Sequence, residues 1–337
     1  MKGTIKRGIS AVHAAVKTFT RTRSAPADDI STEAYAVNSV NVGDYFQLGT
    51  YYGEPILWRC IKIDENGPLM LSDKILSIKP FDASGTNTSG SHGRGGRGYV
   101  HDITAGYFRR QNGSNYWGDS NIRDWLNSDA SAGNVVWSCG NPPDKNHVWD
   151  GYNAYDQEAG FLNGFTSGEK SAIKTVTQKQ LLDGYEYSSS RNENYHRDNS
   201  YIYDVIQNYD TAYSETTTDK VFLLDVKQVY DLYKDLGDYY KAYCTSKAVE
   251  NSDYSDSNIS TSNYGYYWLR SPFTYNSGYS VRKVHPTDSV YYFDADYCDV
   301  GVRPAFYLNL KSMILSGGSG SETEPYVING GGEKRPF

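Results

Sequence analysis

Two β-rich segments that contain proline, and the long segment between them, constrain the fold of this chain most strongly. Residues 266–272 (YYWLRSP) are typical of a strand that stops at a proline. Residues 301–310 (GVRPAFYLNL) are typical of a closing strand, with Pro304 at a bulge or a sheet edge. The 27 residues at 273–299 carry aromatic, hydroxyl, amide and acidic side chains with hardly any apolar alternation. We therefore expect two strands that bracket an irregular segment.

Short strands are also predicted in the first two thirds of the chain. Residues 56–63 and 69–71 are rich in β-forming side chains and flank the turn DENG at 64–67, which predicts a hairpin. Residues 75–81 are expected to be extended, and residues 221–224 to form a further strand. These segments are too short and too dispersed for a purely helical protein.

Helices are predicted to be few, because only three segments have the polar residue that starts a helix. Long stretches at 84–98 and 185–213 lack any hydrophobic periodicity, and such long loops are typical of functional surfaces. The predicted fold class is therefore α+β with long irregular insertions. The three helices are expected over 121–127 after Ser120, over 170–176 after a capping box at 166–169, and over 226–236 after Asp225.

The first 23 residues are predicted to form a basic amphipathic helix. Apolar residues from Ile5 to Phe19 are spaced 4, 3, 4 and 3 apart, and no acidic residue precedes Asp28. A helix over 3–20 is too short to be stable alone, so it either packs on its own domain or binds an assembly partner; a membrane-surface helix or a transit peptide is a further alternative. Residues 24–40 are predicted to be a linker, 41–315 the globular domain and 316–337 a flexible Gly/Ser-rich tail.

Composition excludes several classes of protein. No apolar run approaches the roughly 18 residues of a membrane helix, which argues against a membrane span. The net charge of −7 argues against general nucleic-acid binding. The chain contains 32 Tyr against 11 Phe, together with 32 Gly, and this Tyr-rich mixture is typical of adaptable binding loops.

Cysteine and histidine spacing predicts neither a metal site nor an enzyme. The four cysteines are far apart and form no CxxC or Cys/His motif, so four free thiols and two disulfides both remain open. The six histidines are scattered among loop signals and define no catalytic set. We expect no catalytic residues, no metal and no cofactor.

Five motifs spread over residues 43–310 resemble a known group of bacterial and phage proteins. The motifs WLRSP (268–272) and GVRPAFYLNL (301–310) are the most specific pair. Together they resemble the variable proteins of diversity-generating retroelements, which have a C-type-lectin-like fold in the branch that also holds formylglycine-generating enzymes. The other three motifs are GEPILWRCIKIDENGPLMLSDKIL at 53–76, SNIRDWLNS at 120–128 and DKVFLLDVKQV at 219–229.

The resemblance implies a ligand-binding face that is rewritten by mutagenic reverse transcription at template adenines. The closing strand would pair with early strands, and the variable region would cover about 264–299. Tyr supplies large contact area there and Asn, Ser and Asp supply adaptable polar contacts, while Arg282 adds an interface anchor. The implied ligand-binding residues are Tyr264, Tyr266, Phe273, Tyr275, Asn276, Ser277, Tyr279, Ser280, Arg282, His285, Tyr291, Tyr292, Asp294, Asp296, Tyr297 and Asp299.

The residue types at 273–299 agree with this resemblance. Adenine mutagenesis of AAY codons yields only NNY codons, which never encode Lys, Glu, Gln, Met or Trp. These five types make up 46 of the 337 residues, so composition alone places about 4 of them in 27 residues. Only Lys283 occurs there.

The predicted function is non-enzymatic binding of a protein or glycan receptor on a bacterial cell surface, by a phage tail-associated virion protein or a bacterial surface protein. The absence of a secretory signal favours the virion, to which the helix over 3–20 would attach the domain. The alternative is a fixed, calcium-dependent carbohydrate-binding lectin, since Asp294, Asp296 and Asp299 resemble the start of a calcium loop. Formylglycine-type chemistry is not expected, because Cys298 lies inside the variable region.

Overall fold

The computed structural model describes seven stretches of the chain, all in the unit Ala34–Phe337. The predicted helix over 3–20, the linker up to residue 39 and the predicted site residues Tyr275, Asn276 and Ser277 lie outside the described residues. The same holds for most of the irregular stretches 84–98 and 185–213. The described stretches are 40–85, 112–182, 202–207, 209–273, 278–287, 289–313 and 315–328.

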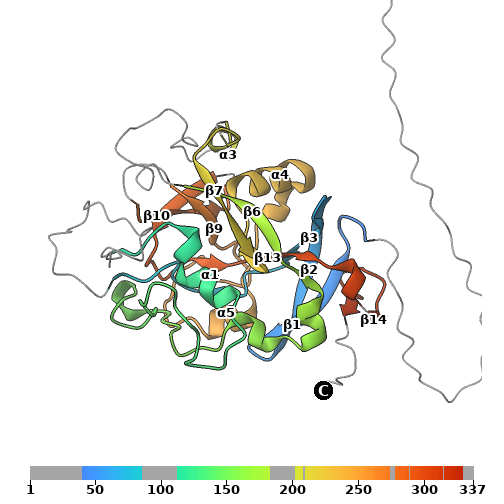
Figure 1. Ribbon diagram of the computed structural model, residues 1–337, viewed down its shortest axis with the longest axis horizontal. Coiled ribbons are helices and arrows are strands. Elements are labelled where there is room, and N and C mark those ends of the chain that lie inside the picture. The colour runs from blue at the N-terminus through green and yellow to red at the C-terminus, as the bar shows by residue number, and fades with distance from the viewer. Residues whose placement is uncertain are drawn as a thin grey trace, which may run out of the picture. The chain divides into compact units, whose positions relative to one another are not determined.

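The described residues form a mixed α+β domain built mainly from strands, which confirms the predicted class (Figure 1). The largest sheet has eight strands, and the hairpin of β2 and β3 is closed by the predicted turn, where Gly67 has a φ of 108° that favours glycine. Its strands are β14 (Leu315–Gly317), β15 (Tyr326–Ile328), β1 (Tyr45–Tyr51), β2 (Glu54–Asp64), β3 (Gly67–Ser72), β13 (Pro304–Leu308) and β5 (Ile173–Lys174), with β8 (Val221–Leu223) also paired to β13.

A second sheet of five strands contains the segment that follows the WLRSP motif. Residues 280–285 and 289–294, which lie in the segment that the sequence predicts to be irregular, form an antiparallel hairpin at the edge of this sheet. Val281, Val284 and Val290 are fully buried and supply the apolar contacts that hold the hairpin on the core. The strand order is β11 (Ser289–Asp294), β10 (Ser280–His285), β9 (Tyr267–Pro272), β12 (Gly301–Val302) and β4 (Ser77–Ile78).

Two strands replace the second half of a predicted helix: β5 of the eight-stranded sheet and the start of a two-stranded sheet. The capping box between Thr166 and Glu169 is present, but α2 (Ser167–Ser171) ends before β5 instead of extending to residue 176. The chain continues as β6 (Val176–Leu181), which pairs with β7 (Ser214–Asp219) in register from Val176↔Asp219 to Leu181↔Ser214. Alternating burial of β6, with Val176, Gln178 and Gln180 inward, stabilises the strand over the helix.

The other helices are short and begin where their capping residues predict. Ser120 accepts a hydrogen bond from the Arg123 backbone N–H, and Asp225 from that of Gln228 at 2.8 Å. Tight 3₁₀ turns connect the remaining elements. The helices are α1 (Asn121–Leu126), α3 (Ile202–Val205), α4 (Val226–Leu236) and α5 (Ser246–Glu250), with 3₁₀ turns η2 (Trp117–Asp119), η3 (Trp149–Gly151), η4 (Phe161–Gly164), η5 (Gly237–Tyr240) and η6 (Leu310–Ser312).

The closing strand passes from one sheet to the other at Arg303. β12 pairs with β4 and β9 in the five-stranded sheet, and β13 pairs antiparallel with β3 and β8 in the eight-stranded sheet. Pro304 begins β13, an inner strand, and so does not lie at the bulge or sheet edge that the sequence predicts; the first position of a strand tolerates a residue without an N–H. Arg303 is 1% exposed and donates hydrogen bonds to the carbonyls of Ser72 (3.0 Å), Tyr239 (3.0 Å) and Tyr240 (3.1 Å), which satisfies the backbone at the crossing.

The sheet continues past residue 315, where the sequence predicts a flexible tail to begin. β14 and β15 form an antiparallel pair, and β15 pairs parallel with β1 through Phe46↔Tyr326. The Tyr326 ring lies 5.1 Å from that of Phe46, and Ile328 is buried. The predicted boundary at 315 is therefore too early, because an apolar strand follows the Gly/Ser turn.

The core lies between the sheets and α1. Trp58, Trp125 and Trp268 are fully buried, and each indole N–H donates to a backbone carbonyl at 2.8–3.0 Å. Within the described part of the chain, no helix combines the length and the hydropathy of a bilayer span.

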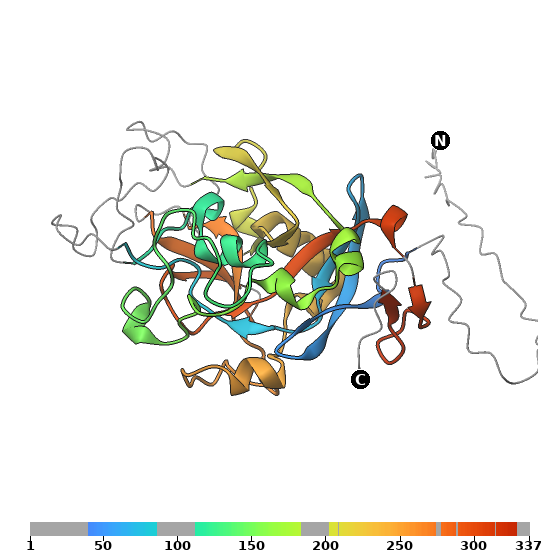
Figure 2. The same cartoon turned by 60° about the horizontal axis from the view of Figure 1, so that its bottom comes forward.

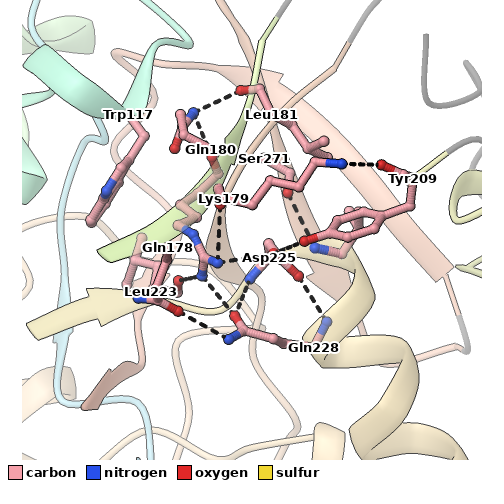
Figure 3. A network of polar contacts seen from close by, with 12 residues as sticks. Trp117, Gln178, Lys179, Gln180, Leu181, Tyr209, Leu223, Asp225, Gln228 and Ser271 are labelled. Atoms are coloured by element: carbon pink, nitrogen blue, oxygen red, sulfur yellow. Dashed lines mark hydrogen bonds and ion pairs between the residues drawn. The ribbon is translucent and has the colours of Figure 1, made fainter. Parts of the chain in front are cut away.

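Arg270 of the WLRSP motif ties β9 to the start of α4. Figure 3 shows its partners Asp225, Leu223 and Gln228 close together in this polar network. Its Nη2 lies 2.9 Å from Asp225 Oδ2, and both side chains are 3% exposed. Its Nη1 donates to the Leu223 carbonyl at 2.6 Å and to Gln228 Oε1 at 2.7 Å. The Tyr209 hydroxyl donates to the same Asp225 oxygen at 2.6 Å. One buried ion pair thus joins β9, β8, α4 and the segment before β7.

We expect the Arg270→Met variant to lose about 3–5 kcal/mol of unfolding free energy, because it leaves the Asp225 carboxylate buried without its cation. The Arg270→Met/Asp225→Asn double variant should lose less, since Asn still caps α4. Urea denaturation measures both values. Lys62→Met breaks the half-exposed pair with Asp231 and should cost less than about 1 kcal/mol. Equal losses for Arg270→Met and Lys62→Met would contradict this role of the buried pair.

Candidate binding surface

The hairpin of β10 and β11 presents two different faces. In its register Arg282 lies opposite Tyr292 and Lys283 opposite Tyr291. Because side chains alternate along a strand, Lys283, His285, Tyr291 and Phe293 share one face and Arg282 and Tyr292 share the other. Tyr291 and Tyr292 are 45% and 40% exposed.

The Tyr291 face carries a row of contacting rings that starts on the hairpin. The His285 ring lies 5.4 Å from that of Tyr291 and stacks on Tyr266 at 5.0 Å. Tyr266 contacts Phe293 edge-on at 6.4 Å, and Phe293 contacts Tyr297 at 4.7 Å. The two strands and the residues that precede β9 and follow β11 therefore form one aromatic surface.

The row continues onto two loops distant in sequence. Trp149 of η3 stacks on Tyr297 at 4.6 Å with an interplanar angle of 7°. Tyr254, in the loop after α5, packs edge-on against Trp149 at 6.0 Å and against Tyr152 at 5.2 Å. Figure 2 shows α5 and the loop that follows it at the bottom of the view. We call this row the aromatic strip; it consists of Tyr291, His285, Tyr266, Phe293, Tyr297, Trp149, Tyr254 and Tyr152.

Asn153 clamps the loops that carry the strip. It is 7% exposed, and its Nδ2 donates to the Cys298 carbonyl at 2.7 Å and to Ser252 Oγ at 3.1 Å. Its backbone N–H donates to Asp253 Oδ1 at 2.6 Å, and its own Oδ1 accepts from the Asp253 N–H at 3.1 Å. Asn153 and Asp150 both adopt left-handed φ values, of 53° and 49°. Such strained backbone persists where the surroundings hold it, and it is frequent at binding sites.

Lys283 lies buried beneath the strip. Its side chain is 2% exposed, and its Nζ lies 3.6 Å from the ring centroid of Tyr266 and 3.1 Å from that of Phe293. No ion pair of Lys283 occurs among the described residues. Burial lowers the pKa of Lys283 to about 7, although the charges of Asp299 and Asp256 oppose this change.

Asp299 is the nearest acidic partner of Lys283. Burial raises the pKa of Asp299 above its ordinary value, and the charge of Lys283 opposes the increase. Its Oδ1 is buried and has no hydrogen-bond partner among the described residues. Burial and the charge of Lys283 lower the pKa of His285. At neutral pH the underside of the strip therefore carries less positive charge than its sequence implies.

The other face of the hairpin carries one closely stacked pair of aromatic rings. Tyr292 stacks on Phe273 at 3.7 Å with an interplanar angle of 14°. The Arg282 guanidinium lies 5.0 Å from the Phe273 ring centroid, and Arg282 is 0% exposed. Arg282 thus supports the aromatic pair from within, although the sequence predicts it as a surface anchor.

The predicted site residues divide into four groups by exposure. Most lie around the hairpin, and Tyr264 stacks instead on Tyr243 at 4.4 Å. Asp294 accepts a hydrogen bond from Asn112 Nδ2 at 2.8 Å. Tyr291 and Tyr292 are exposed; Tyr264, Tyr266, Tyr279, His285, Asp294, Tyr297 and Asp299 are half-buried; Phe273, Ser280, Arg282 and Asp296 are buried; and Tyr275, Asn276 and Ser277 lie outside the described residues.

Sequence reasoning missed Trp149, Tyr152, Tyr254 and Phe293, and it gave Lys283 no role. Trp149 and Tyr152 precede the hairpin by more than a hundred residues, and Tyr254 precedes it by some tens of residues. No local pattern therefore links these three residues to the hairpin. Phe293 could have been recognised, because it alternates with Tyr291 in a β-forming run.

The described residues contain no group of three His, Cys, Asp or Glu side chains that could hold a metal ion. None of the four cysteines forms a disulfide. Burial raises the pKa of Cys298 to about 12, and the charge of Asp299 adds to this effect. Its thiol is therefore protonated at neutral pH and a poor nucleophile.

One protein family, described as a domain of unknown function (DUF6273), matches residues 66–310. This range covers most of the chain and includes the whole five-stranded sheet with its hairpin, as well as β3, β5, β8 and β13 of the eight-stranded sheet, so the chain belongs to that family. No curated protein and no solved structure matches the chain.

We expect the free energy of unfolding to rise with pH between about 7 and 10.5, because unfolded Lys283 keeps a proton that the folded protein has lost. The increase in unfolding free energy between pH 7 and pH 9 should be smaller in Lys283→Met than in the wild type, by up to about 1.4 kcal/mol per pH unit. Urea denaturation at both pH values measures it. The exposed Lys74→Met control should keep the wild-type gain. An unchanged pH dependence in Lys283→Met would contradict the buried, neutral amine.

Proposed function

We propose that this member of the DUF6273 family is a non-enzymatic ligand-binding protein whose hairpin of β10 and β11 is diversified by a retroelement. One contrast carries the proposal: β9 and β13, which bracket the segment, are buried at every position, and the hairpin between them exposes Tyr291 and Tyr292. A scaffold of this kind tolerates changes in the exposed segment, because surface substitutions cost little stability.

The proposal includes a C-type-lectin-like fold. The motif resemblance supports it, as does the pairing of the closing strand with early strands, β12 with β4 and β13 with β3. In this arrangement the termini of the variable segment are held by strands on both sides. The exposed tyrosines combine a large apolar ring with a hydroxyl and lose few torsions on binding, which suits many different ligands.

We further propose a receptor on a bacterial cell surface as the ligand, and a phage tail or a bacterial surface as the location. The helix predicted over 3–20 would attach the domain to its assembly. These statements rest on the resemblance and on the chemistry of the exposed tyrosines. A fixed lectin is the alternative that the following measurement separates from this proposal.

Deep sequencing of this gene in a population that carries it should find substitutions at adenine-derived positions in codons 264–299 and none in codons 300–310. The codon of Lys283 itself contains adenines, so Lys283 should be retained by selection and not by the mutagenesis chemistry, because its side chain is buried. An invariant stretch over 264–299 would contradict diversification and favour a fixed, lectin-like binder.

The Tyr291→Ala/Tyr292→Ala variant should lose binding to intact bacteria from the sampled population, measured by flow cytometry of the labelled protein. Its melting temperature should fall by no more than about 5 °C, because both rings are largely exposed. Tyr233→Ala on α4, where the ring is 38% exposed, is the matched control and should bind normally. Loss of folding in the double variant would assign both tyrosines to the core.

A further inference from the structure

We propose that the aromatic strip recognises a cationic ligand, namely an arginine- or lysine-rich segment of a protein partner. This inference rests on the proposed function, which places the ligand on the hairpin, and it names the chemical class of that ligand. The strip alone would suit several classes of ligand, so the argument depends on the charges beside it.

The segments that form the strip are strongly acidic. Residues 144–156, 250–258 and 278–299 together contain ten Asp or Glu and three Lys or Arg. Two of these cations, Arg282 and Lys283, are buried, and the third, Lys145, is exposed. The surface of the strip therefore offers carboxylates with little compensating positive charge.

Four of these carboxylates lie directly beside strip residues. Asp150 follows Trp149 and is exposed, and Asp253 precedes Tyr254 and is exposed. The carboxylates of Asp299 and Asp256 interact electrostatically with both Lys283 and Tyr254. Burial, together with these charges, raises the pKa of Tyr254. The acidic groups thus surround the strip from three different segments.

The geometry leaves oxygen atoms for a ligand. The Asn153 clamp occupies Oδ1 of Asp253, and Asn258 donates to Oδ1 of Asp256 at 2.8 Å through its backbone. Asp150 is held in the left-handed region by its turn, with its carboxylate toward solvent. A guanidinium can therefore stack on a ring of the strip and donate to a neighbouring carboxylate at the same time.

Electrostatics distinguishes this ligand class from the others. An anionic ligand would be repelled by the carboxylates, and a neutral glycan could donate hydroxyl hydrogen bonds to them but would lack the charge attraction that a cation gains. The low pKa of Lys283 strengthens the preference, since the amine beneath the rings is largely neutral above pH 7. The charged and titratable groups that face it are Asp299, Asp256 and His285, and of these only His285 can become a cation on acidification.

The test uses the full chain and a capped hexapeptide of alternating arginine and glycine, with isothermal titration calorimetry as the measurement. We expect binding that weakens at least about tenfold between 50 and 500 mM NaCl, because exposed charges are screened by salt. The same peptide with citrulline in place of arginine should bind at least about tenfold more weakly, because citrulline keeps the shape and removes the charge.

Two variants locate the contact. Asp150→Asn should weaken binding of the arginine peptide about threefold or more, and Asn adopts the left-handed conformation of this turn as readily as Asp. Glu322→Gln, an exposed carboxylate in the turn between β14 and β15, is the matched control and should leave binding unchanged. Quenching of fluorescence that is lost in Trp149→Phe would place the peptide on the strip.

Three outcomes would overturn the proposal: no binding of the arginine peptide, equal binding of the citrulline peptide, or equal effects of Asp150→Asn and Glu322→Gln. If chitotriose binds at the strip and the arginine peptide does not bind, the ligand class is a glycan and not a cation. Failure here is separable from failure of the proposed function. If codons 264–299 vary in the population and the arginine peptide does not bind, only the ligand class is wrong.

Discussion

The buried ion pair between Arg270 and Asp225 is the interaction on which the rest of the structure depends. Removing two charges from water is costly, and the pair offsets this cost because both terminal nitrogens of Arg270 donate to buried acceptors, namely Asp225, the Leu223 carbonyl and Gln228. Asp225 also caps α4, and the Arg270 backbone N–H donates to the Leu224 carbonyl at 3.0 Å. The strand before the hairpin is thereby fixed to a helix and to the neighbouring strands. Arg303 performs the same task after the hairpin by donating to three backbone carbonyls.

These two arginines explain how a surface segment can change without loss of the fold. Each lies in one of the two motifs that bracket residues 273–299, and each bonds to backbone carbonyls that remain whatever side chains the segment carries. The hairpin is held on the core by Val281, Val284 and Val290, and Arg282 and Lys283 are buried with them. Under the proposed function, stability is provided by the bracketing strands and these buried positions, and Tyr291 and Tyr292 are exposed for recognition.

Local signals in the sequence were sufficient for the parts of the fold that depend on local contacts. Ser120 and Asp225 cap helices where predicted, and the turn at 64–67 joins the predicted hairpin. The helix predicted over 170–176 ends early because Ile173 and Lys174 pair with β13, over 130 residues away in the sequence. The sequence did not predict the strip for the same reason: Trp149 and Tyr254 are brought to Tyr297 by long-range contacts, among them those of Asn153, which no spacing reveals.

Lys283 connects the sequence pattern to the structure of the surface. It is the one residue in 273–299 that an NNY codon does not encode, and it is also buried under the rings of Tyr266 and Phe293. A residue that supports the strip from below has to stay constant if the rings above it are to keep their positions, because an altered core side chain shifts its neighbours. The one residue type in this segment that mutated AAY codons do not yield is therefore at a position where packing restricts substitution. Under the proposed diversification, Lys283 would belong to the scaffold, and the variable surface would begin at the rings that cover it.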